Sequence, residues 1–226
     1  MTDPRDLSRR RHLAFLATGS SALLLPQIVT AMSKLPPGKS VFEVKGTVLV
    51  NGKQATKDTV IFEKDTVETK GDGQMVFAVG SNAFLIRNNS KVELDGSASI
   101  VRALRLVAGK LLSVYGDGRK RVTTPTATIG IRGTGTYMES EPDRTYLCTC
   151  YGTVEMAAAS APDVTETVST KYHESPRYII QDGNGGARIE TAPVINHTDL
   201  ELRLLESLVG RSPPFDGESE GGGGSY

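Results

Sequence analysis

The amino-acid sequence predicts an all-β fold, a β-roll or β-sandwich of short strands, with one helix near the C-terminus. From residue 41 to residue 156, apolar and polar residues alternate in short runs, which is the period of a strand. Turn residues separate these runs, and many of them are among the 24 glycines of the chain. No part of this region shows the apolar period of a helix, so we expect all of it to be sheet and turn.

Residues 1–31 have the three parts of an export signal. Arg9 and Arg10, preceded by Ser8, match the twin-arginine signature, an address that a receptor recognises. An apolar run over 13–25 follows, and it is short for a hydrocarbon core of ~30 Å. We therefore expect export across the bacterial inner membrane into the periplasm. A Sec-type signal and an uncleaved N-terminal anchor are the alternatives.

The β region follows a linker at residues 32–43, where two prolines favour an extended chain. Val44, Val48 and Val50 begin the alternation, and Asn51-Gly52 is a strong hairpin signal. Further strands are expected where β-favouring runs lie between turn residues. These runs are 59–63, 74–79, 83–87, 91–94, 104–110, 111–115, 121–124, 126–131, 136–139 and 145–156.

Residues 157–211 form a C-terminal appendage, with strands expected at 165–170 and 177–181 and a helix at about 199–209. A capping box at 198–201 marks the start of the helix. Its apolar stripe is Leu200, Leu204 and Leu208, widened by Leu202, Leu205 and Val209. Such a short helix needs a packing partner, which we expect to be the β domain itself, with another protein as the alternative. Residues 212–226 are expected to be a disordered tail.

Five blocks of sequence, in the same order, resemble the FecR domain family. They are a turn at 65–73, a strand at 84–94, an L-x-x-G-x-L element at 106–111, a segment at 122–137 and a closing strand at 145–156. The fourth block is the most specific. Its residues that match the core motif of the family are Thr124, Pro125, Ala127, Arg132, Gly133 and Thr134. The resemblance covers residues 44–156, which we therefore identify as a FecR-like β domain.

The resemblance implies an extracytoplasmic domain, which in the type members of the family relays a signal from an outer-membrane receptor to a sigma factor. Those members reach the sigma factor through a cytoplasmic N-terminal segment and a membrane span, for which this sequence has an export signal instead. We therefore expect a periplasmic binding, scaffold or signal-relay module with a protein or cell-envelope partner, but not iron regulation.

No motif of a known enzyme class appears, neither G-x-S-x-G, H-E-x-x-H nor a phosphate-binding loop. We therefore expect no enzymatic activity and no cofactor. Beyond residue 31 the chain carries 22 basic and 24 acidic side chains, a net charge of about −2. This balance gives no reason to expect nucleic acid as a partner.

Arg132 is a candidate ligand contact, because Gly133 and Gly135 would allow a ligand to approach the backbone. The favoured interpretation is structural: Arg132 pairs with a carboxylate, or its side chain caps strand carbonyls where the chain bends.

Cys148 and Cys150 are two residues apart on an expected strand, so their side chains share one face. A disulfide between them would be strained, and buried free thiols are the favoured interpretation. The alternative is a zinc, copper or haem-type site that joins both thiols to His173 or His197. The alternative function is therefore an exported metal- or redox-active protein.

Overall fold

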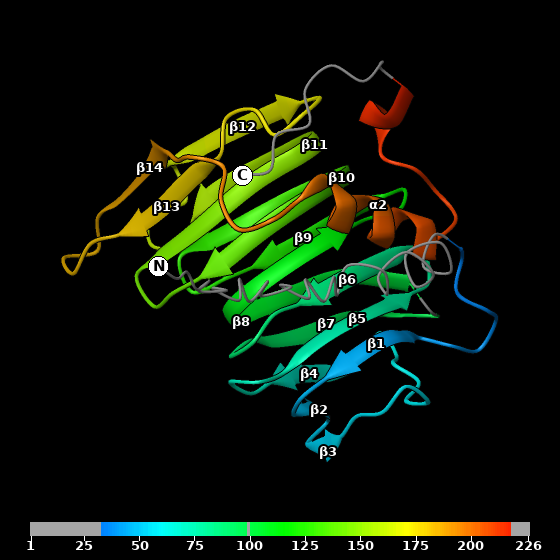
Figure 1. Ribbon diagram of the computed structural model, residues 1–226. Coiled ribbons are helices and arrows are strands. Elements are labelled where there is room, and N and C mark those ends of the chain that lie inside the picture. The colour runs from blue at the N-terminus through cyan, green and yellow to red at the C-terminus, as the bar shows by residue number, and fades with distance from the viewer. Residues whose placement is uncertain (1–32, 99, 218–226) are drawn as a thin grey trace, which may run out of the picture. The chain divides into compact units, whose positions relative to one another are not determined.

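The computed structural model describes residues 33–98 and 100–217. These residues form one sheet of fourteen strands, followed by helix α2 and a 3-10 helix, η1. Figure 1 shows the strands side by side, with α2 lying across one face of the sheet. The all-β prediction with one C-terminal helix is confirmed. The export signal with Arg9 and Arg10, and residues 218–226 of the expected tail, lie outside the described residues.

The element bounds are β1 Val41–Lys45, β2 Val48–Val50, β3 Lys53–Gln54, β4 Thr66–Thr69, β5 Gln74–Val79, β6 Asn82–Ile86, β7 Lys91–Ser97, β8 Ile100–Val114, β9 Arg119–Thr123, β10 Ala127–Ser140, β11 Arg144–Ala158, β12 Thr165–Thr170, β13 Arg177–Gln181, β14 Ala187–Thr191, α2 Asp199–Leu208 and η1 Pro214–Gly217. All strand pairs are antiparallel except β8 with β9, which are parallel. No helix in the described part of the chain is long and apolar enough to cross a membrane.

The long strands β8, β10 and β11 form the spine of the sheet, and β10 changes partner part-way along. Its first half pairs with β9, and its second half pairs with β8. The change occurs around Gly133, which has a φ of 58°, and the register against β11 shifts at the same place. A bulge of this kind bends a strand. The sheet therefore bends at this point rather than extending as a flat layer.

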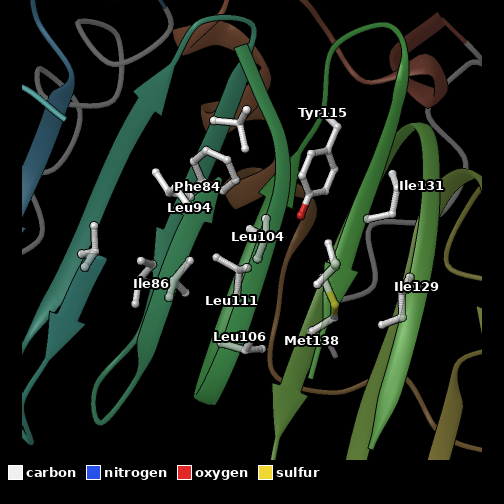
Figure 2. Packing of buried hydrophobic residues seen from close by; sticks show 14 of the residues in the cluster. Phe84, Ile86, Leu94, Leu104, Leu106, Leu111, Tyr115, Ile129, Ile131 and Met138 are labelled. Carbon is white, nitrogen blue, oxygen red and sulfur yellow. The ribbon is translucent and has the colours of Figure 1, made fainter. Parts of the chain in front are cut away.

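The main hydrophobic core lies on the inner side of this bend. Phe77, Phe84, Leu111 and Met138 are fully buried there, and the rings of Phe77 and Phe84 are 5.1 Å apart. Figure 2 shows Phe84, Leu111 and Met138 among the side chains of this core. A second apolar cluster lies beneath α2, where Val76, Leu85 and Leu112 are buried. The strands are therefore covered on both faces in this region.

Two expected features of the strands differ from the structure. Residues 59–63 form no strand. The backbone N–H of Phe62 donates to the side chain of Asp65 at 2.8 Å instead of to a neighbouring strand, and Asn51 Nδ2 holds the same carboxylate at 2.7 Å. The runs 104–110 and 111–115 form one strand, β8, which ends at Val114, because Gly109 bends the chain without ending the strand. The runs 126–131 and 136–139 are likewise one strand, β10.

Residues of the FecR-like blocks meet one another in the fold. Thr69 accepts from the backbone N–H of Ser90 at 2.9 Å, and Ser90 Oγ accepts from the backbone N–H of Lys110 at 2.8 Å. Gly109 packs directly on Ser90 with a φ of 90°. In the fourth block, Thr124 Oγ1 lies 2.7 Å from Thr145 Oγ1. These motif residues therefore hold turns and strands in place.

We expect Gly109→Ala to lower the free energy of unfolding by about 2 kcal/mol or more, since a positive φ disfavours a side chain and strained residues are expensive. The added Cβ would lie 2.5 Å from Ser90 Cα, which is backbone and cannot move aside. Urea denaturation measures the effect. Gly183→Ala is the matched control, because its Cβ meets nothing within 4 Å and should leave stability unchanged.

Helix α2 begins with the expected capping box, in which Thr198 and Glu201 each accept from the other's backbone N–H. Leu202, Leu205 and Leu208 are buried against the sheet, and α2 contacts β6 and β8. Leu200, expected in the apolar stripe, is instead 54% exposed. The cause is the rotation of the helix, which turns Leu202, Leu205 and Leu208 to the sheet. Glu201 pairs with Arg87, just after β6, and Glu206 pairs with Arg211, just after the helix.

The start of the expected disordered tail is also ordered. Residues 214–217 form η1, and Asp216 pairs with Arg203 at 2.8 Å. The ring of Phe215 packs edge-on against Tyr172 with 5.2 Å between centroids. The low-complexity composition begins only after these contacts.

The linker before the β region is shorter than expected, because β1 begins at Val41.

Candidate metal centre

Cys148 and Cys150 lie on β11, the strand at the centre of the second apolar cluster. Both are free thiols with no exposed surface. Their alternate positions on the strand direct both side chains to the face that the C-terminal segment covers. The rigid pairing of β11 with β10 holds both backbone positions, since Tyr137 lies opposite Cys148 and Thr136 opposite Thr149.

His173 and His197 come to this face from two separate connections. His173 lies between β12 and β13, and its backbone N–H donates to the carbonyl of Cys150 at 3.0 Å. His197 directly precedes the N-cap residue of α2. The chain before it is fixed by Asn196, whose carbonyl accepts from Arg87 Nη2 at 2.8 Å. Both imidazoles are buried, with 7% and 2% of their surface exposed.

The four side chains form one compact cluster. His173 Nδ1 lies 3.0 Å from His197 Nε2 and 3.7 Å from Cys148 Sγ. With Cys150 Sγ included, all four ligand atoms lie within 4.8 Å of one another. A tetrahedral zinc ion with bonds of about 2.0–2.3 Å needs its ligand atoms about 3.3–3.8 Å apart. The observed cluster is therefore close to the size of a four-coordinate site.

The outer nitrogen of each ring faces a hydrogen-bond acceptor. His173 Nε2 is 3.0 Å from Asp199 Oδ1, and His197 Nδ1 is 2.6 Å from the carbonyl oxygen of Ile195. Tyr172 donates to the other oxygen of Asp199 at 2.7 Å and holds the carboxylate in place. Metal-binding histidines are typically oriented in this way, by a carboxylate or a carbonyl on the nitrogen that does not bind the metal.

The hydrogen bonds of the outer nitrogens determine whether each inner nitrogen carries a proton or a lone pair. In a neutral imidazole, a proton on the outer nitrogen leaves a lone pair on the inner one. His173 Nδ1 and His197 Nε2 would then face each other with two lone pairs at 3.0 Å. This arrangement is favourable only with a cation between them, whether a proton or a metal ion. Two neighbouring thiols as additional donors favour the metal ion.

The electrostatics of the cluster favour a thiolate. A hydrogen bond from Cys150, with further ones from His173 and His197, lowers the pKa of Cys148 to about 4 although burial opposes this. Burial, and then the neighbouring Cys148, raise the pKa of Cys150 well above its usual range. Burial also lowers the pKa of His173, but Cys148 and Asp199 outweigh burial and raise it overall. Thiolates are the form of cysteine that binds metals.

Aromatic rings enclose the cluster. Tyr137 stacks on His197 with 4.8 Å between ring centroids, and Tyr172 packs edge-on against His173 at 4.9 Å. The ring of Phe215, from η1, lies 6.3 Å from that of His173. The donor set of two sulfurs and two nitrogens suits zinc or copper, and the aromatic cover separates it from solvent.

The structure thus brings together all four residues that the sequence separates by up to 49 positions. The cluster includes both histidines, whereas the metal site proposed from the sequence as an alternative required only His173 or His197. Sequence reasoning missed Asp199 and the Ile195 carbonyl, which orient the rings. The sequence assigns Asp199 to the first turn of a helix, and only its position two residues after His197 could have suggested a second role.

The residues of the FecR-like core motif lie elsewhere in the fold. Arg132 is exposed on β10, opposite Arg119 on β9. The structure shows neither the ion pair nor the carbonyl cap expected for Arg132 among the described residues. Gly133 and Thr134 pack against Gly152 at the bulge of β10.

Comparison with known proteins gives no matching family model and no match among the curated proteins. Two similar solved structures are crystal structures, at 1.65 Å and 2.50 Å resolution, of a "putative anti-sigma factor" from Parabacteroides distasonis. Both are 10% identical in sequence, with TM-scores of 0.46 and 0.47, and cover 56% and 61% of this chain. The matches span 59% and 70% of those chains. The likeness is partial, and no function is transferred from it.

Proposed function

We propose that this chain is an exported, non-enzymatic binding and signal-relay module that holds one zinc ion between Cys148, Cys150, His173 and His197. The observation that carries the proposal is the orientation of the two imidazoles. Both outer nitrogens face acceptors, so that both inner nitrogens face each other and the two thiols. This donor arrangement suits a metal ion better than it suits four unbound side chains.

The metal ion would join three parts of the chain. The two thiols belong to β11, one imidazole to the β12–β13 connection and the other to the start of α2. Because such a site forms only when its ligands are assembled, the free energy of metal binding also stabilises the docked segments. Metal occupancy would therefore control the position of α2, which is how this domain could relay a signal.

The arrangement does not favour catalysis. Catalytic zinc sites have three protein ligands and keep one position for water or substrate, whereas four protein ligands and a cover of aromatic rings are typical of structural sites. The proposal is therefore a structural or sensory ion rather than a Lewis acid at a reaction centre.

Metal content tests the proposal. We expect full-length protein from cells grown with zinc to contain about one zinc ion per chain by elemental analysis, as a four-ligand site binds one ion. Cys148→Ser and His197→Gln should each lose most of it. Thr149→Ser is the matched control: Thr149 lies between the cysteines and is buried, but it is not one of the four ligands. Metal-free protein with two titratable thiols would contradict the proposal, and stoichiometric copper would replace zinc in it.

Export in the folded state fits a buried site, because the ion can be loaded before translocation. We expect Arg9→Lys with Arg10→Lys to leave a precursor in the cytoplasm, since the twin-arginine receptor reads the arginine pair as an address. Fractionation followed by immunoblotting measures the effect, and a strain that lacks the twin-arginine translocase is the control. Unchanged export of the variant would show that the Sec channel carries the protein.

A further inference from the structure

The arginines of the described chain fall into two groups. Six of the eleven form ion pairs with carboxylates: Arg87, Arg144, Arg177, Arg188, Arg203 and Arg211. The other five form no such pair within residues 33–98 and 100–217, and all of them are exposed: Arg102, Arg105, Arg119, Arg121 and Arg132. These five lie on the neighbouring strands β8, β9 and β10. We call them the arginine face.

The strand register directs these side chains to one side of the sheet. Arg119 and Arg121 alternate with buried Lys120 and Val122 on β9. Lys120 is turned away, and its Nζ donates to the carbonyl of Asp117 at 2.7 Å. On β8, the register against β7 passes from Val101 to Ala103, so that Arg102 is the extra residue of a bulge. The bulge allows Arg102 and Arg105 both to be exposed although they are three residues apart on a strand whose side chains alternate between faces.

This arrangement opposes folding. Arg119 and Arg132 are directly opposite each other on paired strands, and like charges in such positions destabilise a sheet. The chain as a whole has equal numbers of acidic and basic side chains, so the arginine face is not the result of a basic overall composition. Nearby carboxylates form no ion pair with the arginine face within the described residues. Glu93, opposite Arg105, pairs with Lys91 at 3.4 Å, Glu166 pairs with Arg177 at 2.6 Å, and Glu155 forms no ion pair there.

Arg102, Arg119 and Arg121 border a groove of about 750 Å³ that crosses β8 to β12, and Arg132 borders an adjoining hollow together with Arg119. Its floor carries small residues, including Ala103 and Gly130. Gly130 lies between Arg121 on β9 and Glu155 on β11 in the strand register. The far side carries the hydroxyls of Thr165 and Thr167. The groove therefore offers guanidinium groups along one side and threonine hydroxyls along the other, with the carboxylate of Glu155 between them. Glu166, which also lines the far side, is already paired with Arg177.

We propose that this groove binds an acidic stretch of a partner protein. Arginine presents a planar set of donors that matches a carboxylate in two parallel hydrogen bonds, and it does so better than lysine. Glu155 in the groove would repel a uniformly anionic polymer, whereas a polypeptide can place a basic or neutral residue there. Threonine hydroxyls can bond to peptide groups of such a segment. The groove shares no residue with the metal centre, so the proposal does not depend on the bound ion.

The test uses full-length protein and a synthetic peptide of about twenty residues rich in glutamate, at 150 mM salt, where exposed charges are largely screened beyond ~8 Å. The test variant is Arg119→Gln, Arg121→Gln and Arg132→Gln combined. The control variant removes three positive charges elsewhere, through Lys57→Gln, Arg144→Gln and Arg188→Gln. We expect the test variant to bind the peptide about tenfold more weakly or worse, and the control to bind as the unchanged protein does.

Two further measurements separate the proposal from simpler explanations. The melting temperature of the test variant should stay the same or rise, because like charges are removed, and its metal content should not change. A fall in melting temperature would show that these arginines stabilise the sheet, and it would overturn the proposal. Equal losses in both variants, no peptide binding, or tighter binding to phosphatidylglycerol vesicles than to the peptide would overturn it as well.

Discussion

Removing the zinc ion should lower the melting temperature of the protein by about 8–16 °C. A ligand present at a thousand times its dissociation constant stabilises the folded state by about 4 kcal/mol, and 1 kcal/mol shifts the melting temperature of a domain of this size by about 2–4 °C. Differential scanning calorimetry before and after treatment with a strong zinc chelator measures the shift. Adding zinc back should restore the original value.

Hydrogen exchange should show which part of the protein loses stability when the ion is removed. Hydrogen exchange should increase in α2 and around His173, which the ion joins to β11, while the amides of β8 and β10 stay protected by the sheet. Cys148→Ser should melt at the temperature of the chelated protein and should not respond to zinc. If the chelator removes the metal without changing melting or exchange, the ion does not hold the segment, and the relay part of the proposed function fails.

Much of the sheet could be predicted from local sequence, because its turns are encoded locally. Asn51-Gly52 forms a turn with both residues at positive φ, as a hairpin of this type requires. Strand continuity was harder to predict. Glycine usually marks the end of a strand, but Gly109 and Gly133 lie inside β8 and β10, where they form bends with positive φ. Only the neighbouring strands show that the chain continues.

The metal centre, too, could be predicted only in part from local sequence. The two-residue spacing of Cys148 and Cys150 places both thiols on one face of a strand, and this could be inferred without a structure. The positions of His173 and His197 could not, because they depend on how β12 turns back on β11 and where α2 begins. Zinc motifs with fixed spacing come from local turns, whereas these ligands are assembled by the topology of the sheet.

The C-terminal segment should contribute as much to stability as a core element does. Truncation after Asn196 removes Leu202, Leu205 and Leu208, each of which is at most 2% exposed. At about 1.5–3 kcal/mol for each buried leucine, the loss is about 5–9 kcal/mol as an upper estimate, enough to unfold a marginally stable domain. We expect a lower melting temperature and more binding of a dye that reports exposed apolar surface. If the truncated protein is as stable as the full chain but no longer binds a partner protein, α2 is instead a binding site for that partner.

Truncation also removes His197, so a single substitution must separate packing from metal binding. We expect Leu205→Ala to lower the free energy of unfolding by about 2–5 kcal/mol, the range for a leucine removed from a packed core. Its metal content should stay at one ion per chain, because Leu205 is not a ligand. Leu200→Ala is the matched control on the same helix, where a side chain that is 54% exposed should contribute little. If both substitutions have the same small effect in urea denaturation, α2 does not depend on the sheet for its packing, and the ion alone holds it there.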